Sequence, residues 1–167
     1  MSIPDFLAAA ADLHLSLSAL CDTLAGLSRD MPAAGPLRAL SREKARQANA
    51  LRRANRDRGT LASLITGVQV DGDAVRRGIE GAETLRRTLL GGRASLAAGL
   101  RGLSALERDL AAILAAAPDF ADISLNRAIL NVRKKGQAHI ALLQGLVDGP
   151  GEGGPGAEAP GGPNEGS

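Results

Sequence analysis

Apolar residues in the first thirty positions recur with alternating steps of four and three residues. This spacing is typical of helices in coiled coils and antiparallel bundles, because it keeps one side of the helix apolar. Ser2 can cap such a helix, and Pro4 suits its first turn. The segment "MPAAGP", residues 31–36, has two prolines and a glycine and predicts that the helix ends there. The apolar series is Phe6, Ala10, Leu13, Leu17, Leu20, Leu24 and Leu27.

A second helix is predicted from near Leu37 to about Val70, with apolar ends and a strongly charged middle. The middle is "SREKARQANALRRANRDRG", residues 41–59. The apolar stripe along which helices pack is called the seam. A polar residue in the seam fixes the register of the packed helices and lowers stability somewhat. The apolar seam is reduced in this stretch to three residues, Ala48, Leu51 and Ala54.

The second half of the chain repeats the same kind of pattern. "VDGD", residues 70–73, predicts a break, with Asp73 as the cap of a third helix. Gly78 and Gly81 weaken that helix, each by about 1 kcal/mol relative to alanine. Gly91–Gly92 predicts a turn, and Pro118 ends the fourth helix that follows it. The apolar residues of the fourth helix are Leu96, Leu100, Leu103, Leu106, Leu110 and Ile113.

A fifth helix is predicted to end near Val147, and its candidate caps are Asp119, Asp122 and Ser124. The remaining sequence is rich in Gly, Pro and Glu and has almost nothing to bury, so we predict a disordered tail. The predicted fold is therefore all-α, an elongated antiparallel helical bundle or coiled-coil hairpin. The helical domain covers residues 1–147, and the tail covers residues 148–167.

The composition favours helices, and it also indicates the cellular compartment of the protein. Phe6 and Phe120 are the only aromatic residues, whereas Ala, Leu and Arg are abundant. Cys21 is the single cysteine, which excludes an internal disulfide, and no Cys/His cluster offers a zinc site. The N-terminus lacks the basic region of a signal peptide, and no uncharged run reaches the roughly 20 residues of a membrane span. We expect a soluble, cytoplasmic protein.

No combination of residues matches the chemistry of an enzyme. His14 and Cys21 share a helix face but lie about 10 Å apart along it, too far for a nucleophile and its base. The simpler interpretation is that Cys21 is a buried thiol and that His14 and His139 lie at the boundary of the core. "GGRASLAAG", residues 91–99, lacks the Gly-Lys-Ser/Thr ending of a phosphate loop. We therefore expect no enzymatic activity and no cofactor.

The basic segment 42–58, within this charged stretch, allows two interpretations. All 20 Lys and Arg residues precede the acidic tail, so the helical domain is moderately basic. The solvated face of a helix, with arginine stems covering a thin seam, is the commoner explanation. The alternative is a helical nucleic-acid-associated protein, such as a phage packaging or nucleoid component, that contacts phosphate through Arg52, Arg53 and Arg56.

The last predicted helix has a broader apolar surface than one seam requires. Such a helix can dock on the bundle as its last member, or it can pair with a helix of a partner protein. Arg133 to Lys135, "RKK", interrupts the apolar face and is expected to remain in water. The candidate partner-binding residues are Ile123, Leu125, Ile129, Val132, Ile140, Leu143 and Leu146.

Residues 37–68 combine a charged step, leucines, an asparagine and a glycine at Glu43–Lys44, Leu51, Asn55, Leu61 and Gly67. In this pattern the segment resembles the FlgN-like flagellar export chaperones. Arg58 replaces the second Asn of the family pattern, and the C-terminal Tyr/Gly signature is missing. The resemblance implies a small cytoplasmic helical protein that escorts hook-associated proteins to the export apparatus. It also implies that the client site is the C-terminal amphipathic helix.

The sequence thus predicts a non-enzymatic protein that binds a secreted or flagellar client through its last helix. Two rival interpretations remain open at this point. One is the nucleic-acid-associated protein described above, and the other is a structural bundle that assembles with copies of itself.

Overall fold

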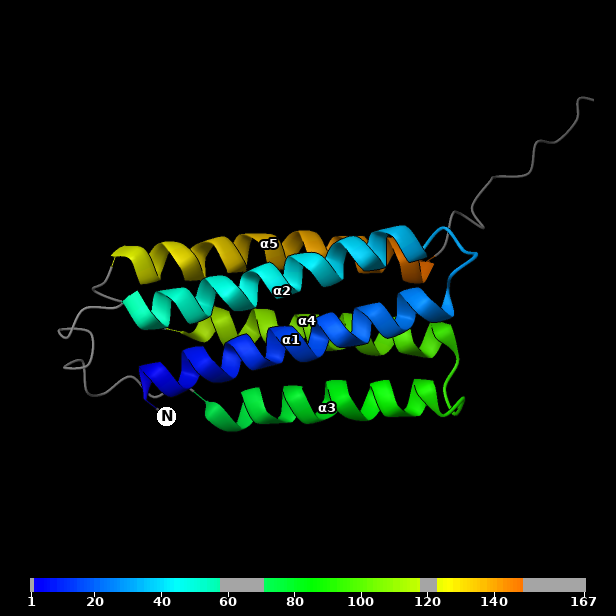
Figure 1. The fold of residues 1–167 in the computed structure, drawn as a ribbon, viewed down its shortest axis with the longest axis horizontal. Helices are drawn as coiled ribbons and strands as arrows, with labels where there is room; N and C mark the ends of the chain where they lie inside the picture. Colours follow the sequence, from blue (N-terminus) through cyan, green and yellow to red (C-terminus); the bar gives the residue numbers. More distant parts are fainter. Residues whose placement is uncertain (1, 58–70, 118–122, 149–167) are drawn as a thin grey trace, which may run out of the picture.

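The computed structural model describes residues 2–57, 71–117 and 123–148 and shows an all-α fold in these ranges. Figure 1 shows the helices side by side along the longest axis, with each helix antiparallel to the next along the chain. The predicted elongated antiparallel helical bundle is therefore confirmed. Asp148, the first residue of the predicted tail, is the last residue of α5, and the rest of the predicted tail, residues 149–167, lies outside the described residues. The helices are α1 (Ile3–Leu27), α2 (Ala34–Asp57), α3 (Gly72–Leu90), α4 (Leu96–Ala116) and α5 (Ile123–Asp148).

The ends of α1 follow from local hydrogen bonding. Ser2 is its N-cap, and the Ser2 hydroxyl accepts a hydrogen bond from the backbone N–H of Asp5 at 3.3 Å. Asp5 lies in the first turn, where a negative charge is favourable beside the free N–H groups. At the other end, the Ser28 backbone N–H donates to the Leu24 carbonyl at 2.9 Å. The predicted cap and the predicted end before Met31 are both confirmed.

Two predicted helix starts are wrong by a few residues. α2 begins at Ala34 rather than near Leu37, because Pro36 fits a first helical turn, where its missing N–H is not needed. The cap of α3 is Asp71 and not Asp73: the Asp71 carboxylate accepts from the backbone N–H groups of Asp73 and Ala74 at 3.0 and 2.9 Å. The predicted end of the second helix near Val70 falls outside the described residues.

α1 is the central helix of the bundle, and α5 is a peripheral one. α1 packs against α2, α3 and α4, whereas α5 packs against α4 and α2. In Figure 1, α2 and α5 lie along one edge of the molecule and α3 lies along the opposite edge. This arrangement leaves one side of α5 without a neighbouring helix in the described structure.

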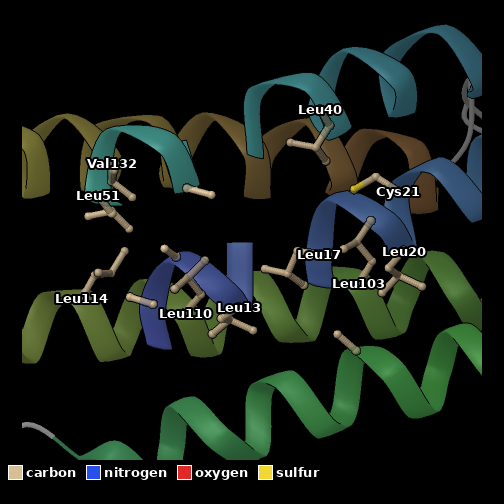
Figure 2. Close-up of a cluster of buried hydrophobic side chains, with 14 of the residues drawn as sticks. Leu13, Leu17, Leu20, Cys21, Leu40, Leu51, Leu103, Leu110, Leu114 and Val132 are labelled. Atoms are coloured by element: carbon tan, nitrogen blue, oxygen red, sulfur yellow. The ribbon is translucent and has the colours of Figure 1, made fainter. Parts of the chain in front are cut away.

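The core is built mainly from leucine and alanine. Figure 2 shows leucines from α1, α2 and α4 converging in the middle of the bundle, with Val132 of α5 and the thiol of Cys21 at its border. Burial of such side chains supplies about 1.5–3 kcal/mol each relative to exposure. Phe6 is the one aromatic side chain of the described core, and it is fully buried.

Glycines allow α4 to approach α1 and α3 closely. A Cβ at Gly99 would lie 2.6 Å from a methyl of Leu24, and one at Gly102 would lie 2.5 Å from a methyl of Leu85. Real Cβ atoms do not come so close to their neighbours, so a larger residue at either position would require the facing leucine to shift. In the turn before α4, Gly92 has a φ of 66°, which residues with side chains rarely adopt. The predicted turn at Gly91–Gly92 is thus confirmed.

Among the described helices, α1 alone has the length and apolar composition to cross a membrane. Its side chains are mostly buried among the other helices, however. The core helix of a bundle passes the same criteria of length and composition.

Candidate functional site

The predicted partner-binding residues lie on different sides of α5. Those that face the bundle belong to its core and are at most 3 % exposed: Leu125, Ile129, Val132 and Leu143. Ile140 and Leu146 are half-buried, and Ile123 is 76 % exposed. The structure therefore docks α5 as the last helix of the bundle. In this arrangement Ile123 is the one fully accessible residue of the predicted set, whose role in client binding stays a prediction.

The outer side of α5 carries apolar residues that the prediction did not include. Leu130 is 56 % exposed and Leu142 is 38 % exposed, both within the helix. A hollow of about 890 Å³ is lined by Leu130 and its neighbours between Ile123 and Lys134, and Leu142 lies outside it. The other exposed large apolar residues of the described chain lie at a helix end or in a turn: Leu27, Met31 and Leu90.

The basic middle of α2 is divided between the surface and the core. Arg53 and Arg56 are exposed, and the exposed Arg52 donates to the Asp12 carboxylate at 2.9 Å. These side chains line a groove of about 630 Å³ between α1 and α2. Lys44 belongs to the same segment but is 0 % exposed. The prediction that this whole segment is solvated is therefore wrong at Lys44.

Lys44 forms a buried ion pair with Glu107 of α4. The Lys44 Nζ donates to Glu107 Oε2 at 2.5 Å, and each side chain is 1 % exposed. Removing two charges from water costs several kcal/mol per ion, and their attraction offsets this only when the contact is close. The pair thus depends on both partners being present, and it joins α2 to α4 in the middle of the bundle.

Two buried histidines lie beside this ion pair. His14 of α1 is 0 % exposed and His139 of α5 is 8 % exposed, so neither is the boundary residue that the sequence predicted. Together with Lys44 and Glu107 they form what we call the buried polar cluster. It contains one side chain from each of α1, α2, α4 and α5.

Several atoms of the buried polar cluster have no hydrogen-bond partner among the described residues. They are Nδ1 and Nε2 of His14, Oε1 of Glu107 and Nδ1 of His139, and both amide atoms of nearby Gln47 are in the same situation. A buried polar atom without a partner costs about 1–3 kcal/mol, and such atoms are usually satisfied by water or by a ligand. The centre of this bundle is therefore less stable than a purely apolar core would be.

The environment shifts the pKa of each histidine downward and that of the glutamate upward. Burial, and then the positive charge of Lys44, holds the pKa of His14 well below its usual range. Burial and Lys44 also lower the pKa of His139 to about 4. Burial raises the pKa of Glu107, and Lys44 offsets only part of this effect. At neutral pH both imidazoles are therefore uncharged, each with one N–H donor and one acceptor nitrogen.

A cavity of about 430 Å³ opens onto the buried polar cluster between α4 and α5. His14, Lys44 and Glu107 form its polar floor. Its walls are mostly apolar, and Leu130 and Lys134 at the surface mark its mouth. A volume of several hundred Å³, with apolar walls and a few converging polar groups, is typical of a small-molecule site.

Charged residues attach α5 to its neighbours on either side of this cavity. The Arg133 guanidinium donates to the Leu114 and Ala117 carbonyls at 2.7 and 2.6 Å, which satisfies the C-terminus of α4. Lys135 forms an ion pair with Glu43 of α2. The prediction that residues 133–135 remain in water is therefore wrong for Arg133 and Lys135, which are half-buried.

The thiol of Cys21 is a structural part of the core, as predicted. It is fully buried, and burial raises the pKa of this thiol far above its usual range. A thiol that stays protonated is a poor nucleophile. Within the described residues, no group of three His, Cys, Asp or Glu side chains is arranged to hold a metal ion.

Comparison with known proteins gives no relative from which a function can be transferred. No family model matches the chain, no curated protein matches it, and no solved structure matches it. A proposal about its function therefore rests on the residues and their geometry, together with the resemblance of residues 37–68 described above.

Proposed function

We propose that this protein is a non-enzymatic, helix-binding protein whose α5 receives an amphipathic helix of a partner protein. The observation that supports this proposal is the position of the exposed apolar side chains. On α5 they are Leu130 and Leu142 within the helix and Ile123 at its first residue, and Ile123 and Leu130 line a hollow on its surface. Elsewhere in the described structure, residues of this kind occur only at helix ends and in a turn. A partner helix would remove these side chains from water.

The partner would be a secreted or flagellar protein, and the protein would act as its export chaperone in the cytoplasm. This narrower proposal depends on the resemblance of residues 37–68 to FlgN-like chaperones. The position of α5 is compatible with it, because α5 lies at the periphery of the bundle and one of its sides has no described neighbour. If α5 detaches from the bundle during binding, the client contacts the core-facing side of α5 as well as its outer side.

The first test compares two double variants in binding to purified hook-associated proteins from the same organism. We expect Ile123→Ser with Leu130→Ser to weaken binding by roughly thirtyfold to a hundredfold, because two apolar contacts lose about 2–3 kcal/mol together. Leu27→Ser with Leu90→Ser is the matched control, since it removes two exposed leucines that lie off α5. Equal affinity of the two double variants would overturn the assignment of the outer side.

A tether distinguishes the outer side of α5 from its buried side. The side chains of Arg108 and Gln144 are hydrogen-bonded between α4 and α5 at 3.0 Å, so cysteines at these positions can be joined by a short bis-maleimide. Cys21 is buried and should not react. If the tethered protein binds its client normally, the outer side is used. If the tether abolishes binding, the client instead needs the core-facing residues Leu125, Ile129, Val132 and Leu143.

The arginine groove favours a second candidate function, which is binding of a nucleic acid. Arg53 and Arg56 line this groove with Arg52, whose charge Asp12 partly neutralises. If nucleic acid is the partner, Arg53→Ser with Arg56→Ser should weaken DNA binding and lower its dependence on salt. Self-association is the remaining alternative, and it predicts oligomers that increase with concentration and disappear in the Ile123/Leu130 double variant.

A further inference from the structure

The cavity between α4 and α5 reaches from the surface to the centre of the bundle. Its mouth lies beside Leu130 and Lys134 of α5, which are exposed. Its floor is formed by His14 and Lys44, which belong to α1 and α2 and are 0 % exposed. The cavity has a volume of about 430 Å³, which is within the usual range for small-molecule sites.

The floor offers both hydrogen-bond donors and hydrogen-bond acceptors that the protein leaves unused. Glu107 Oε1 is an acceptor without a partner, and His14 has neither of its ring nitrogens paired. Lys44 is an ammonium with three N–H donors, one of which is used by Glu107. A group that can donate and accept at once, such as a hydroxyl, complements this floor better than a group that can do only one.

Charged head groups fit the same floor poorly. The charges of Lys44 and Glu107 already neutralise each other, so a carboxylate or an ammonium would meet one repulsion for each attraction and would lose its water without net compensation. The low pKa of His14 keeps its imidazole neutral, so the histidine does not compensate an added negative charge. The apolar walls, which include Leu110, Leu114 and Val132, require a hydrocarbon body behind the head group.

We infer that this cavity is a binding site for a small uncharged amphiphile with a hydroxyl head and a short aliphatic body. The hydroxyl lies on the floor, where it donates to Glu107 Oε1 and accepts from Lys44 or His14. The aliphatic body lies along the apolar walls and points to the mouth beside Leu130. The proposal does not rest on client binding by α5, because the floor and most of the walls belong to the interior of the bundle, although Leu130 and Lys134 at the mouth also border the outer hollow.

Two glycines of α5 provide a matched pair of variants for the test. A Cβ at either Gly136 or Gly145 would meet no atom within 4 Å, and both positions lie inside the helix. Gly136 lines the cavity and Gly145 does not. Leucine at either position should improve helix propensity similarly, but only Gly136→Leu should place a side chain in the cavity.

The experiment titrates 1-hexanol, hexanoate and hexylamine into the full-length protein. Binding is followed by NMR of leucine and valine methyl groups, since the chain has no Trp or Tyr for fluorescence. We expect saturable binding of hexanol that shifts the methyl signals of Leu114 and Val132, with hexanoate and hexylamine at least about tenfold weaker. Gly136→Leu should weaken hexanol binding at least about tenfold, and Gly145→Leu should leave it unchanged.

Three results would overturn the inference. If hexanol does not bind, the cavity holds water only. If hexanoate or hexylamine binds as tightly as hexanol, the floor does not select a hydroxyl. If Gly145→Leu weakens binding as much as Gly136→Leu, the bound molecule is not in this cavity. Should Gly136→Leu fail to fold, Ala111→Leu provides a second filling variant, because Ala111 is a half-buried residue of the cavity wall.

Discussion

Glu43 and Lys44 are adjacent on α2, yet they form ion pairs in opposite environments. Glu43 pairs with Lys135 of α5 near the surface, where the lysine side chain is 43 % exposed. Lys44 pairs with Glu107 of α4 in the core, where both side chains are 1 % exposed. The two pairs contain the same chemical groups and each joins α2 to another helix. Glu43 also pairs with Arg46, so the comparison of the two pairs shows how burial and the number of partners together change the value of an ion pair.

The difference follows from what happens when one partner is absent. At the surface, water solvates the remaining charge, so an exposed pair contributes only about 0–1 kcal/mol. In the core, the remaining charge has no water, and its removal from solvent is uncompensated. If one residue of the inner pair is present, the fold therefore needs the other to neutralise it. The outer pair adds only a little to the stability that the packing of α5 provides.

The largest expected effect comes from removing one charge of the inner pair. Lys44→Met should lower the free energy of unfolding by about 3–5 kcal/mol, because Glu107 then stays buried without a partner. The matched variant Lys135→Met should lower it by less than about 1 kcal/mol. Urea denaturation followed by circular dichroism measures both. Similar losses in the two variants would show that burial does not separate the pairs.

Much of the fold is predictable from the sequence because helix faces follow a simple period. Of the apolar series in α1, all residues except Leu27 are buried, and Leu27 is exposed because it is the last residue of the helix. The Ser2 cap and the turn at Gly91–Gly92 are also local features that the sequence predicts. The predicted cap of α3 is wrong because Asp71 and Asp73 are both acceptable caps, and the pattern does not distinguish them.

The buried polar cluster could not be predicted in the same way, although a partial signal exists. Lys44 falls at a seam position between Leu40 and Leu51, and Glu107 falls at one between Leu103 and Leu110. Opposite charges at seam positions of two helices indicate a buried pair. The pairing itself joins residues 63 positions apart and depends on which helices are neighbours. The periodic pattern gives the face of each helix but not its partner.

The next prediction separates two quantities: the net contribution of the inner pair to the free energy of unfolding, and the loss that occurs when only one of its residues is removed. In the double variant Lys44→Met with Glu107→Leu, no charge is left alone, so most of the loss should disappear. We expect the double variant to lie within about 1–2 kcal/mol of the unaltered protein, and the coupling free energy to be about 3 kcal/mol. The same cycle for Glu43 and Lys135 should give less than about 1 kcal/mol. If the two losses simply add for the inner pair, Lys44 and Glu107 do not depend on each other.

The smallest expected effect is a change of the free energy of unfolding with pH, which arises from the titratable groups of the interior. The pKa of His139 is about 4 in the folded protein, below its usual value of 6.5, so the unfolded chain binds more protons at intermediate pH. Stability should therefore fall as the pH falls below about 6.5, and His14 acts in the same direction. The raised pKa of Glu107 acts in the opposite direction, because the folded state then holds the extra proton.

A histidine variant isolates this effect from those of the carboxylates. Burial raises the pKa of Glu43, but its hydrogen bonds and attraction to Lys135 and Arg46 lower it overall, so this carboxylate takes up a proton only below its usual range. Between about pH 7.5 and pH 5, His139 should contribute a loss of about 1 kcal/mol, allowing for its partial access to water. His139→Gln should reduce the loss in the free energy of unfolding over this pH range by this amount, as measured by urea denaturation at each pH. Lys135→Met should leave this pH dependence unchanged. An unchanged slope in His139→Gln would mean that this imidazole is equally easy to protonate in the folded and unfolded states, and that the interior around Lys44 is better hydrated than its burial indicates.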